Sequence, residues 1–470
     1  MALAVHECSP AISALAIEWC VAEALMGGTP AMRRAGKAHL PQWPAEELAA
    51  YNARLSTATL FPAYRRTVGV MAGKPFSKEL TLSADTPASI QTWAEDIDQQ
   101  GVSLHAWAAD AFHETVAYGL DGVLIDYPAV PTGKGRTVAQ VEASGARPYF
   151  VHIKHHQILG WRAAVQGGKM RLTQLRIVEA VEEEDGAFGV TCVPQVRVLF
   201  PGGWQTWREI AGKGWQMYTS GRTTLSDIPF VPFYGRRAGF MIGEPALLDL
   251  AYLNVKHWQS QSDQDTILHA ARVPILTIAG IDEMPQLAIG GSTAINLGRN
   301  PDAKILWVEH TGAAIEAGAK SLAALEEQMI QTGAELLVKK PGQRTAAESN
   351  NDAEGNKCDL QRMAEGFEDA LDQALWFMAQ YARLPSAGKV SLFKDYGAAT
   401  LSDASATLVK DLNMAGIVTK STVIEEMKRR GVLSSDIDTE TEIAAAEAEG
   451  PPLGGLGVPP EVGSATSVAG

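Results

Sequence analysis

The order of long helical patterns in residues 243–385 constrains the fold of this chain more than any other feature. The predicted segments are a helix at 243–271, a compact β-rich insert at 273–311, a helix at 313–338, a polar segment at 339–357 and a helix at 358–384. Pro341 and Gly342 end the second helix, and the polar loop that follows has no apolar anchor. The order predicts a wall of helices with one projection, which is typical of a structural component rather than of an enzyme.

The three predicted helices differ in how much of their surface is apolar. The first has a partly polar stripe, formed by Leu247, Leu250, Asn254, Trp258 and Gln261. The second has a thin apolar seam, formed by Leu322, Leu325, Met329, Gly333 and Leu336. The third has a wider apolar face, formed by Leu360, Met363, Phe367, Leu371, Leu375 and Met378. We therefore expect the third helix to dock on a core, and the first two to be solvated or packed against other copies of the chain.

Length and composition indicate a globular protein of several domains. The chain has 470 residues, enough for about two to four domains, with 46% hydrophobic and 20% charged residues. It has no apolar run long enough for a membrane span, and its first residues lack the basic region of a secretory signal. The four cysteines (Cys8, Cys20, Cys192 and Cys358) form no CxxC pair, so we expect a reduced cytosolic chain without disulfides or structural zinc.

The negative charge is concentrated near the C-terminus. The formal net charge is −14, and residues 431–470 contain seven acidic residues and no basic one. The rest of the chain is mildly acidic, which disfavours tight static binding to nucleic acid. A surface that repels phosphates is still compatible with nucleic acid moving past it.

Outside residues 243–385 the sequence predicts helices and an antiparallel sheet. The predicted helices lie at 11–26, at 44–73 with a break at Pro62, at 87–119, and as a short pair at 401–433. A strand is expected at 122–128, and a meandering antiparallel sheet at 147–235, where apolar and polar residues alternate between glycine pairs. Residues beyond about 450 are expected to be disordered. The expected fold class is α+β.

Motif searches predict no catalytic residue and no cofactor. HExxH, GxSxG and a GxGxxG ahead of a helix are absent, and the sequences around Lys37 and Lys134 fail the P-loop pattern. The acidic run at 182–186 is expected to be a charged hairpin tip.

A group of histidines is interpreted as a surface patch on a strand. His152, Lys154 and His156 would point to one face of the strand and His155 to the other. Metal binding needs a carboxylate or a thiolate nearby, and the local sequence supplies neither, so no metal site is predicted.

Three cations lie at the edges of the polar segment 339–357: Lys339, Lys340 and Arg344. Composition alone favours a solubilising loop. The alternative is a loop whose long flexible cations touch the phosphates of a moving polyanion without reading its bases.

Several stretches of the chain resemble the portal proteins of tailed bacteriophages. The N-terminal stretches are 40–44 (LPQWP), 51–55 (YNARL), 65–69 (RRTVG) and 73–76 (GKPF). The middle stretches are 243–254 (GEPALLDLAYLN), 257–260 (HWQS) and 272–274 (RVP). Residues 344–349 (RTAAES) are similar to the tunnel-loop segment of portals, with Ala347 where threonine is common. The order and spacing of these stretches carry the resemblance.

The resemblance implies a portal-like subunit with a mixed α/β wing, long stem helices, a small β-containing clip and a helical crown. The implied parts are a wing at 1–242, stem helices at 243–271 and 313–338, a clip at 272–312, a tunnel loop at 339–357, a wing return at 358–400, a crown at 401–450 and a disordered tail at 451–470. Such subunits form a ring, most often of about twelve copies, at one capsid vertex, through which genome DNA is packaged and ejected.

The resemblance also implies contact residues and partners. The implied DNA-facing residues of the tunnel loop are Lys339, Lys340, Arg344 and Glu348. The implied clip residues that dock the terminase large subunit, and later the head-to-tail adaptor, are Asp282, Glu283, Arg299 and Asp302. Further implied partners are the major capsid protein, the scaffolding protein and double-stranded DNA bound without sequence specificity, with no membrane. The implied location is the portal vertex of the virion, after assembly in the host cytoplasm.

Two other functions stay open from the sequence. A minor head or adaptor protein is another structural virion component, although such proteins are usually shorter. A phage hydrolase would need a histidine and acids brought together from separate segments, such as Asp126, His155 and Glu209.

Overall fold

The computed structural model divides into two units, Met1–Phe393 and Lys394–Gly470. The described residues are 3–128, 146–272, 275–279, 304–308, 312–337, 357–394, 396, 419–429, 433 and 437–449. Within these ranges helices are mixed with antiparallel sheets, so the predicted α+β class is confirmed. Among the described residues no helix has both the length and the hydropathy of a membrane span.

The first unit begins with a group of helices. They are α1 (Pro10–Met26), α2 (Gly28–Ala35), the 3₁₀ turn η1 (Gly36–Ala38), α3 (Leu48–Thr57) and α4 (Ala63–Gly73). The predicted helix at 11–26 and the break at Pro62 are confirmed. The predicted start at Pro44 is wrong, because Glu46 accepts hydrogen bonds from the Trp43 N–H and from Arg54 and holds a turn there.

The helical pattern predicted at 87–119 forms two helices, α5 (Ala88–Ala94) and α6 (Leu104–Tyr118). Between them the side chains of Asp96 and Asp98 accept hydrogen bonds from backbone N–H groups of the connecting turn. These bonds compete with the helical ladder and interrupt it. Ser103 then begins α6 by accepting a hydrogen bond from the Ala106 N–H.

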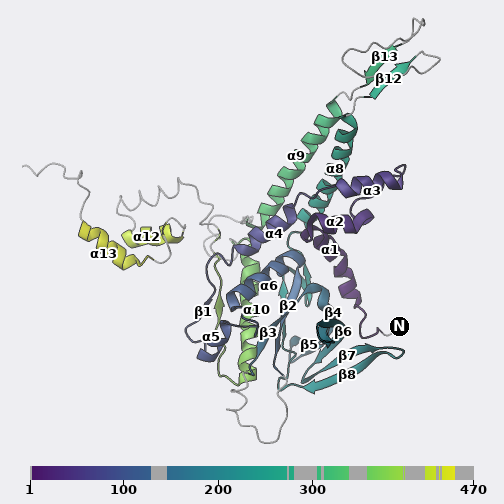
Figure 1. Ribbon diagram of the computed structural model, residues 1–470. Coiled ribbons are helices and arrows are strands. Elements are labelled where there is room, and N and C mark those ends of the chain that lie inside the picture. The colour runs from purple at the N-terminus through teal and green to yellow at the C-terminus, as the bar shows by residue number, and fades with distance from the viewer. Residues whose placement is uncertain are drawn as a thin grey trace, which may run out of the picture. The chain divides into compact units, whose positions relative to one another are not determined.

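A three-stranded antiparallel sheet, in the order β3-β2-β9, is covered on both faces. Its strands are β2 (Leu120–Asp126), β3 (Tyr149–Ile153) and β9 (Phe230–Tyr234). On one face Phe233 meets Trp107 of α6 and Phe367 of α10 (Asp359–Ala382). On the other face Leu120 and Leu124 share a core with α1 and the second sheet, and Figure 1 shows these layers.

The second sheet is a five-stranded antiparallel meander. It consists of β4 (Ile158–Gln166), β5 (Lys169–Asp185), β6 (Gly189–Phe200), β7 (Gly203–Ile210) and β8 (Gly214–Arg222), in that order. The predicted meander is confirmed for 158–222, whereas β3 and β9, at the two ends of the range predicted for it, belong to the three-stranded sheet. The acidic run at 182–186 is the exposed end of β5 and its turn into β6, which confirms the predicted hairpin tip.

Shorter elements complete the first unit and form a helical pair in the second. The two-stranded pairs are β1 (Thr81–Leu82) with β14 (Val390–Ser391), and β10 (Arg236–Gly239) with β11 (Ile242–Glu244). In the second unit α12 (Lys420–Arg429) contacts α13 (Thr439–Glu449). α12 lies within the predicted pair at 401–433, whereas α13 lies beyond it.

The region singled out in the sequence has the predicted order of helices. It contains α8 (Leu248–Ala271), β12 (Ile275–Ala279), β13 (Lys304–Val308), α9 (Ala313–Ala334), the 3₁₀ turn η3 (Glu335–Leu337) and α10. The six apolar residues predicted to dock α10 on a core are all buried. On α9 the seam residues Leu322, Leu325 and Met329 are buried within the chain itself, so the expectation that this helix is solvated or covered by other copies is wrong for these residues.

α8 is more deeply buried within its own chain than predicted. It contacts α1, α3 and α4 as well as α9, and Leu250, Asn254 and Trp258 are completely buried. The expectation that this helix is solvated or covered by other copies is therefore wrong for its first half. A polar residue can be buried when it is hydrogen-bonded, and the helical pattern alone does not reveal such bonds. Asn254 accepts from the Tyr64 N–H at 3.0 Å and donates to the Phe61 carbonyl at 2.9 Å.

Candidate functional site

The candidate site is the segment from α8 to α10, in which two long helices lie side by side (Figure 1). β12 and β13 pair in antiparallel register between the end of α8 and the start of α9 in the chain. Gln264 of α8 contacts Ile315 near the start of α9, and the earlier residue His257 contacts the later residue Glu326, so the two helices run antiparallel. The segment therefore has the geometry of a helical hairpin with a β-structured insertion.

Polar contacts fix the register of α8 against α9. The Gln264 amide donates to the Ile315 carbonyl at 3.0 Å, and His257 Nε2 lies 3.3 Å from Glu326 Oε1. Gly318 faces the Gln264 side chain so closely that a Cβ there would overlap it. The pair is thus held by specific contacts along its length and not by apolar packing alone.

Salt bridges and hydrogen bonds also tie α8 to the N-terminal helices. Arg54 of α3 makes a buried salt bridge to Glu46 at 2.8 Å, and its guanidinium lies 3.8 Å from Asp263 of α8. Gln259 of α8 donates to the His39 carbonyl at 2.9 Å. Residues 40–55, which carry the N-terminal resemblance, therefore contact the helix that carries the middle resemblance.

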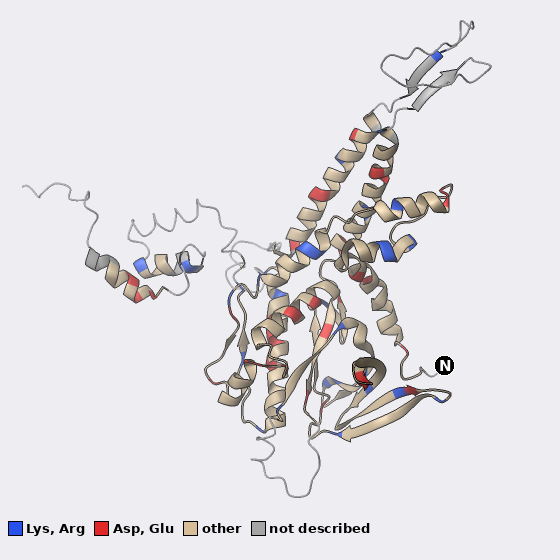
Figure 2. Ribbon diagram, in the orientation of Figure 1, with Lys and Arg blue, Asp and Glu red and all other residues tan. Residues whose placement is uncertain are grey.

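The helix pair carries more acids than bases. The acids of α8 and α9 are Asp249, Asp263, Asp265, Glu316, Glu326 and Glu327, and the bases are Lys256 and Lys320. Figure 2 marks these charges along both helices. The net charge of the pair is negative, and so it repels phosphates.

The contact residues implied by the portal resemblance all lie outside the described residues. Lys339, Lys340, Arg344 and Glu348 fall between η3 and α10, and Asp282, Glu283, Arg299 and Asp302 fall between β12 and β13. Their roles stay predictions. The disordered tail predicted at 451–470 and, apart from Lys357, the tunnel loop predicted at 339–357 also lie outside the described ranges.

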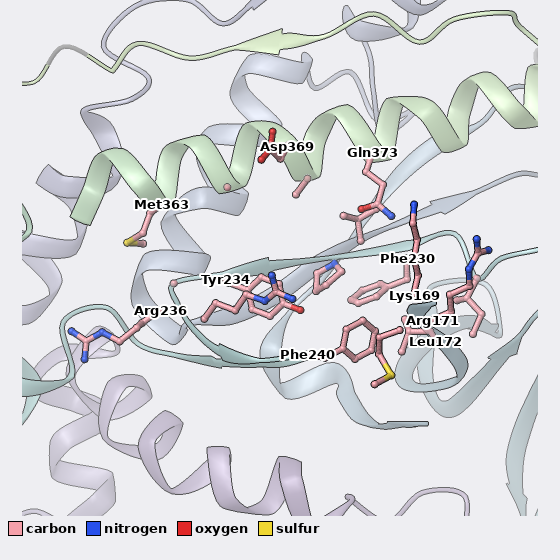
Figure 3. Close-up of a pocket in the computed structure, with 18 of the residues that line it drawn as sticks. Lys169, Arg171, Leu172, Phe230, Tyr234, Arg236, Phe240, Met363, Asp369 and Gln373 are labelled. Atoms are coloured by element: carbon pink, nitrogen blue, oxygen red, sulfur yellow. The ribbon is translucent and has the colours of Figure 1, made fainter. Parts of the chain in front are cut away.

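A cavity that the sequence reasoning missed lies between α10 and the strands β9 and β10 (Figure 3). Its volume is about 1160 Å³, and its lining includes Phe230, Tyr234, Phe240 and Trp376. Arg171 pairs with Asp227 at 2.5 Å on one side of it. Charged side chains also line it: three carboxylates (Asp227, Asp359 and Asp369) and five bases (Lys169, Arg171, Arg236, Arg237 and Arg362).

The prediction that His152 belongs to a surface patch is wrong. Its Nε2 lies 2.6 Å from the buried carboxylate of Asp121, which also accepts a hydrogen bond from Thr115 of α6. Burial raises the pKa of Asp121, although the bonds to His152 and Thr115 act in the opposite direction. These contacts connect α6 to β2 and β3 of the three-stranded sheet.

The raised pKa of Asp121 predicts how stability depends on pH. The folded chain holds this proton more tightly than the unfolded chain, so the contribution to stability is greatest in acid and is lost as pH rises through the raised pKa. Relative to Asp121→Asn, the wild type should lose about 1.4 kcal/mol for each pH unit in that window. Denaturant unfolding of both proteins from pH 4 to pH 8 measures the slope, and Asp265→Asn, at an exposed position of α8, gives the baseline.

His155 and His156 lie in a 3₁₀ turn, η2 (His155–Gln157), rather than on the strand predicted for them. His155 is only 3% exposed, and its Nε2 lies 2.9 Å from Glu23 Oε1 of α1. Burial lowers the pKa of His155, so the ring is neutral near pH 7. Three side-chain atoms that could bind a metal ion, one each from Glu23, His155 and His156, lie within 4.8 Å of one another. The carboxylate that the local sequence lacks therefore comes from a distant helix.

The structure does not support the hydrolase alternative at its proposed residues. Asp126 pairs with Arg197 at 2.6 Å, and His155 pairs with Glu23. Glu209 lies exposed on β7. Two of the three residues thus have other partners, and a histidine–acid pair between Asp126 and His155 is not formed.

One family model matches the region that contains the candidate site. A family model described as a domain of unknown function (DUF4055) matches residues 246–382, which run from α8 to the end of α10. No curated protein matches the sequence.

Solved structures of gene transfer agent (GTA) particles are similar to the chain at low identity. A chain from the neck of an empty GTA particle, computed with C6 symmetry, is 13% identical; the match covers 79% of this chain and 90% of that chain with a TM-score of 0.42. Chains from the virion of a native GTA particle and from its neck, computed with C12 symmetry, are each 12% identical. Each of these two matches covers 85% of this chain and 98% of the other, with a TM-score of 0.40. These scores are too low to establish a shared fold.

Proposed function

We propose that this chain is the subunit of a portal ring, a structural component of a phage-type virion through which genome DNA is packaged and ejected. The observation that supports it most is the order of elements in residues 246–382: a long helix, a β-structured insert, an antiparallel long helix and a third helix docked on the body. Stem helices, a clip and a return to the wing have this order in the family that the sequence resembles.

The charge of the helix pair fits a conduit. Six acids against two bases on α8 and α9 leave a surface that repels the phosphates of a passing duplex. A ring that bound DNA tightly would hold it in place, whereas a repelling wall lets it slide. Lys339, Lys340 and Arg344 then provide the few cations that follow the phosphates.

In the proposed function the ring formed by this chain is a passive conduit for DNA that can be gated. Energy for packaging comes from ATP hydrolysed by a separate terminase, which docks on the insert between β12 and β13 through Asp282, Glu283, Arg299 and Asp302. A head-to-tail adaptor replaces the terminase there after packaging. The other partners are neighbouring copies of the chain, the major capsid protein and the scaffolding protein.

Deleting residues 343–355 tests the role of the polar loop. Rings should still form, because the deletion spares α8, α9 and α10, the helices that hold the subunit together. Particles carrying the deletion should lose packaged DNA, since the segment that checks back-slippage is gone. The measurement is the fraction of filled particles after packaging in vitro, with nuclease protection as the readout.

A charge variant with a matched control sharpens that test. Replacing Lys339, Lys340 and Arg344 by glutamine should also lower DNA retention, whereas replacing Lys169, Lys213 and Arg222, exposed bases of the meander sheet, should leave it unchanged. Full retention and normal packaging in the deletion would show that the loop has no part in gating.

A further inference from the structure

We propose that Glu23, His155 and His156 form a binding site for a divalent transition metal of the zinc type. One ligand atom from each residue lies within 4.8 Å of the other two, close enough for a single ion to reach all three. Glu23 comes from the last turns of α1, and the histidines come from the connection between β3 and β4. An ion here would cross-link segments that are 132 residues apart in the chain.

The side chain of His155, one of the three proposed metal ligands, is held in place by aromatic side chains around it. The His155 ring stacks on Tyr118 with 3.8 Å between ring centroids, and the edge of Trp19 packs against it at 5.2 Å. Trp19 also donates from Nε1 to the Tyr118 carbonyl at 2.8 Å, which fixes α1 against the end of α6. A buried ring stacked in this way cannot swing away from Glu23, and such preorganisation favours ligation.

The third residue distinguishes a metal site from a simple hydrogen bond. The contact of 2.9 Å between Glu23 and His155 would exist with or without an ion. It does not require His156, whose ring nevertheless lies 5.0 Å from that of His155 at an interplanar angle of 87°. Glu23 and His156 are both exposed, so an ion can enter from solvent and keep water in its fourth position.

The ligand set and the nearby charges indicate the kind of ion. Two imidazoles and a carboxylate suit zinc, cobalt or nickel, whereas magnesium and calcium prefer oxygen ligands. The neighbouring cation Lys154 lies 3.6 Å from Glu114, so a second carboxylate offsets its charge near the site. This inference is independent of the proposed portal function.

The test is calorimetric titration of the full chain with Zn²⁺, with the exposed cysteines Cys8, Cys20 and Cys192 replaced by serine to remove competing thiolates. We expect one ion per chain, with no binding of Mg²⁺. Glu23→Gln and His156→Gln should each weaken binding by at least about tenfold. Both changes are at exposed positions and leave the buried His155 ring in place, so the chain should fold.

His269→Gln, a change at an exposed histidine on α8, is the matched control and should bind Zn²⁺ like the parent protein. Co²⁺ provides a second readout, since its visible absorption reports tetrahedral coordination. Equal affinity in the parent, Glu23→Gln and His156→Gln proteins would overturn the proposal, as would the absence of stoichiometric Zn²⁺ binding to the parent.

Discussion

Replacing Trp258 by alanine is expected to lower the free energy of unfolding by about 3–5 kcal/mol. Trp258 is completely buried on α8, which contacts α1, α3, α4 and α9. Truncation would leave a large cavity at the junction of these helices, and the bonded neighbours of α8 would prevent its collapse. Denaturant unfolding of the purified chain, followed by far-ultraviolet circular dichroism, measures the loss.

Two further tryptophan variants isolate the cause. Trp376 of α10 is 44% exposed, so Trp376→Ala should cost much less than Trp258→Ala. Trp258→Phe should also cost less, because it keeps most of the volume and removes an indole N–H that has no partner among the described residues. Equal losses for Trp258→Ala and Trp376→Ala would contradict the placement of α8 inside the subunit.

Replacing Gly119 by alanine should be still more damaging, with a loss above about 4 kcal/mol. Gly119 ends α6 with φ of 82°, a conformation that a side chain disfavours. A Cβ at this position would also overlap the backbone of Glu244 and Pro245, just before α8. The expected result is a chain that folds poorly, measured by soluble yield and by thermal unfolding.

Gly101→Ala separates the two causes of that loss. Gly101 has a similar φ of 88°, but apart from its two chain neighbours no described residue has an atom within 4 Å of the position of its Cβ. Its substitution should therefore show only the backbone strain, about 1–2 kcal/mol. If Gly119→Ala were no worse than Gly101→Ala, the close contact between the end of α6 and the segment leading into α8 would be wrong.

Much of the fold could be predicted because local pattern and final structure agree. The wide face of α10, from Leu360 to Met378, is buried as its periodicity indicates. The five-stranded meander follows from alternation and from the glycine pairs that turn it, such as Gly167 and Gly168 at positive φ. The predicted break lies at Pro62, which directly precedes α4, although α3 already ends at Thr57.

The rest depends on contacts between distant segments, which local pattern does not encode. Asn254 reads as a polar residue of a solvated helix, yet its bonds to Phe61 and Tyr64 bury it. His155 reads as a strand residue on an open face, yet Glu23, far away in sequence, closes over it. The only sequence signal for these two contacts is that both partner segments contain groups able to form hydrogen bonds.

Negative-stain microscopy combined with mass photometry of the purified chain at moderate salt tests the portal proposal most directly. We predict rings of about twelve copies with a central hole wide enough for a DNA duplex. A compact dimer with no hole at any concentration would contradict the proposal.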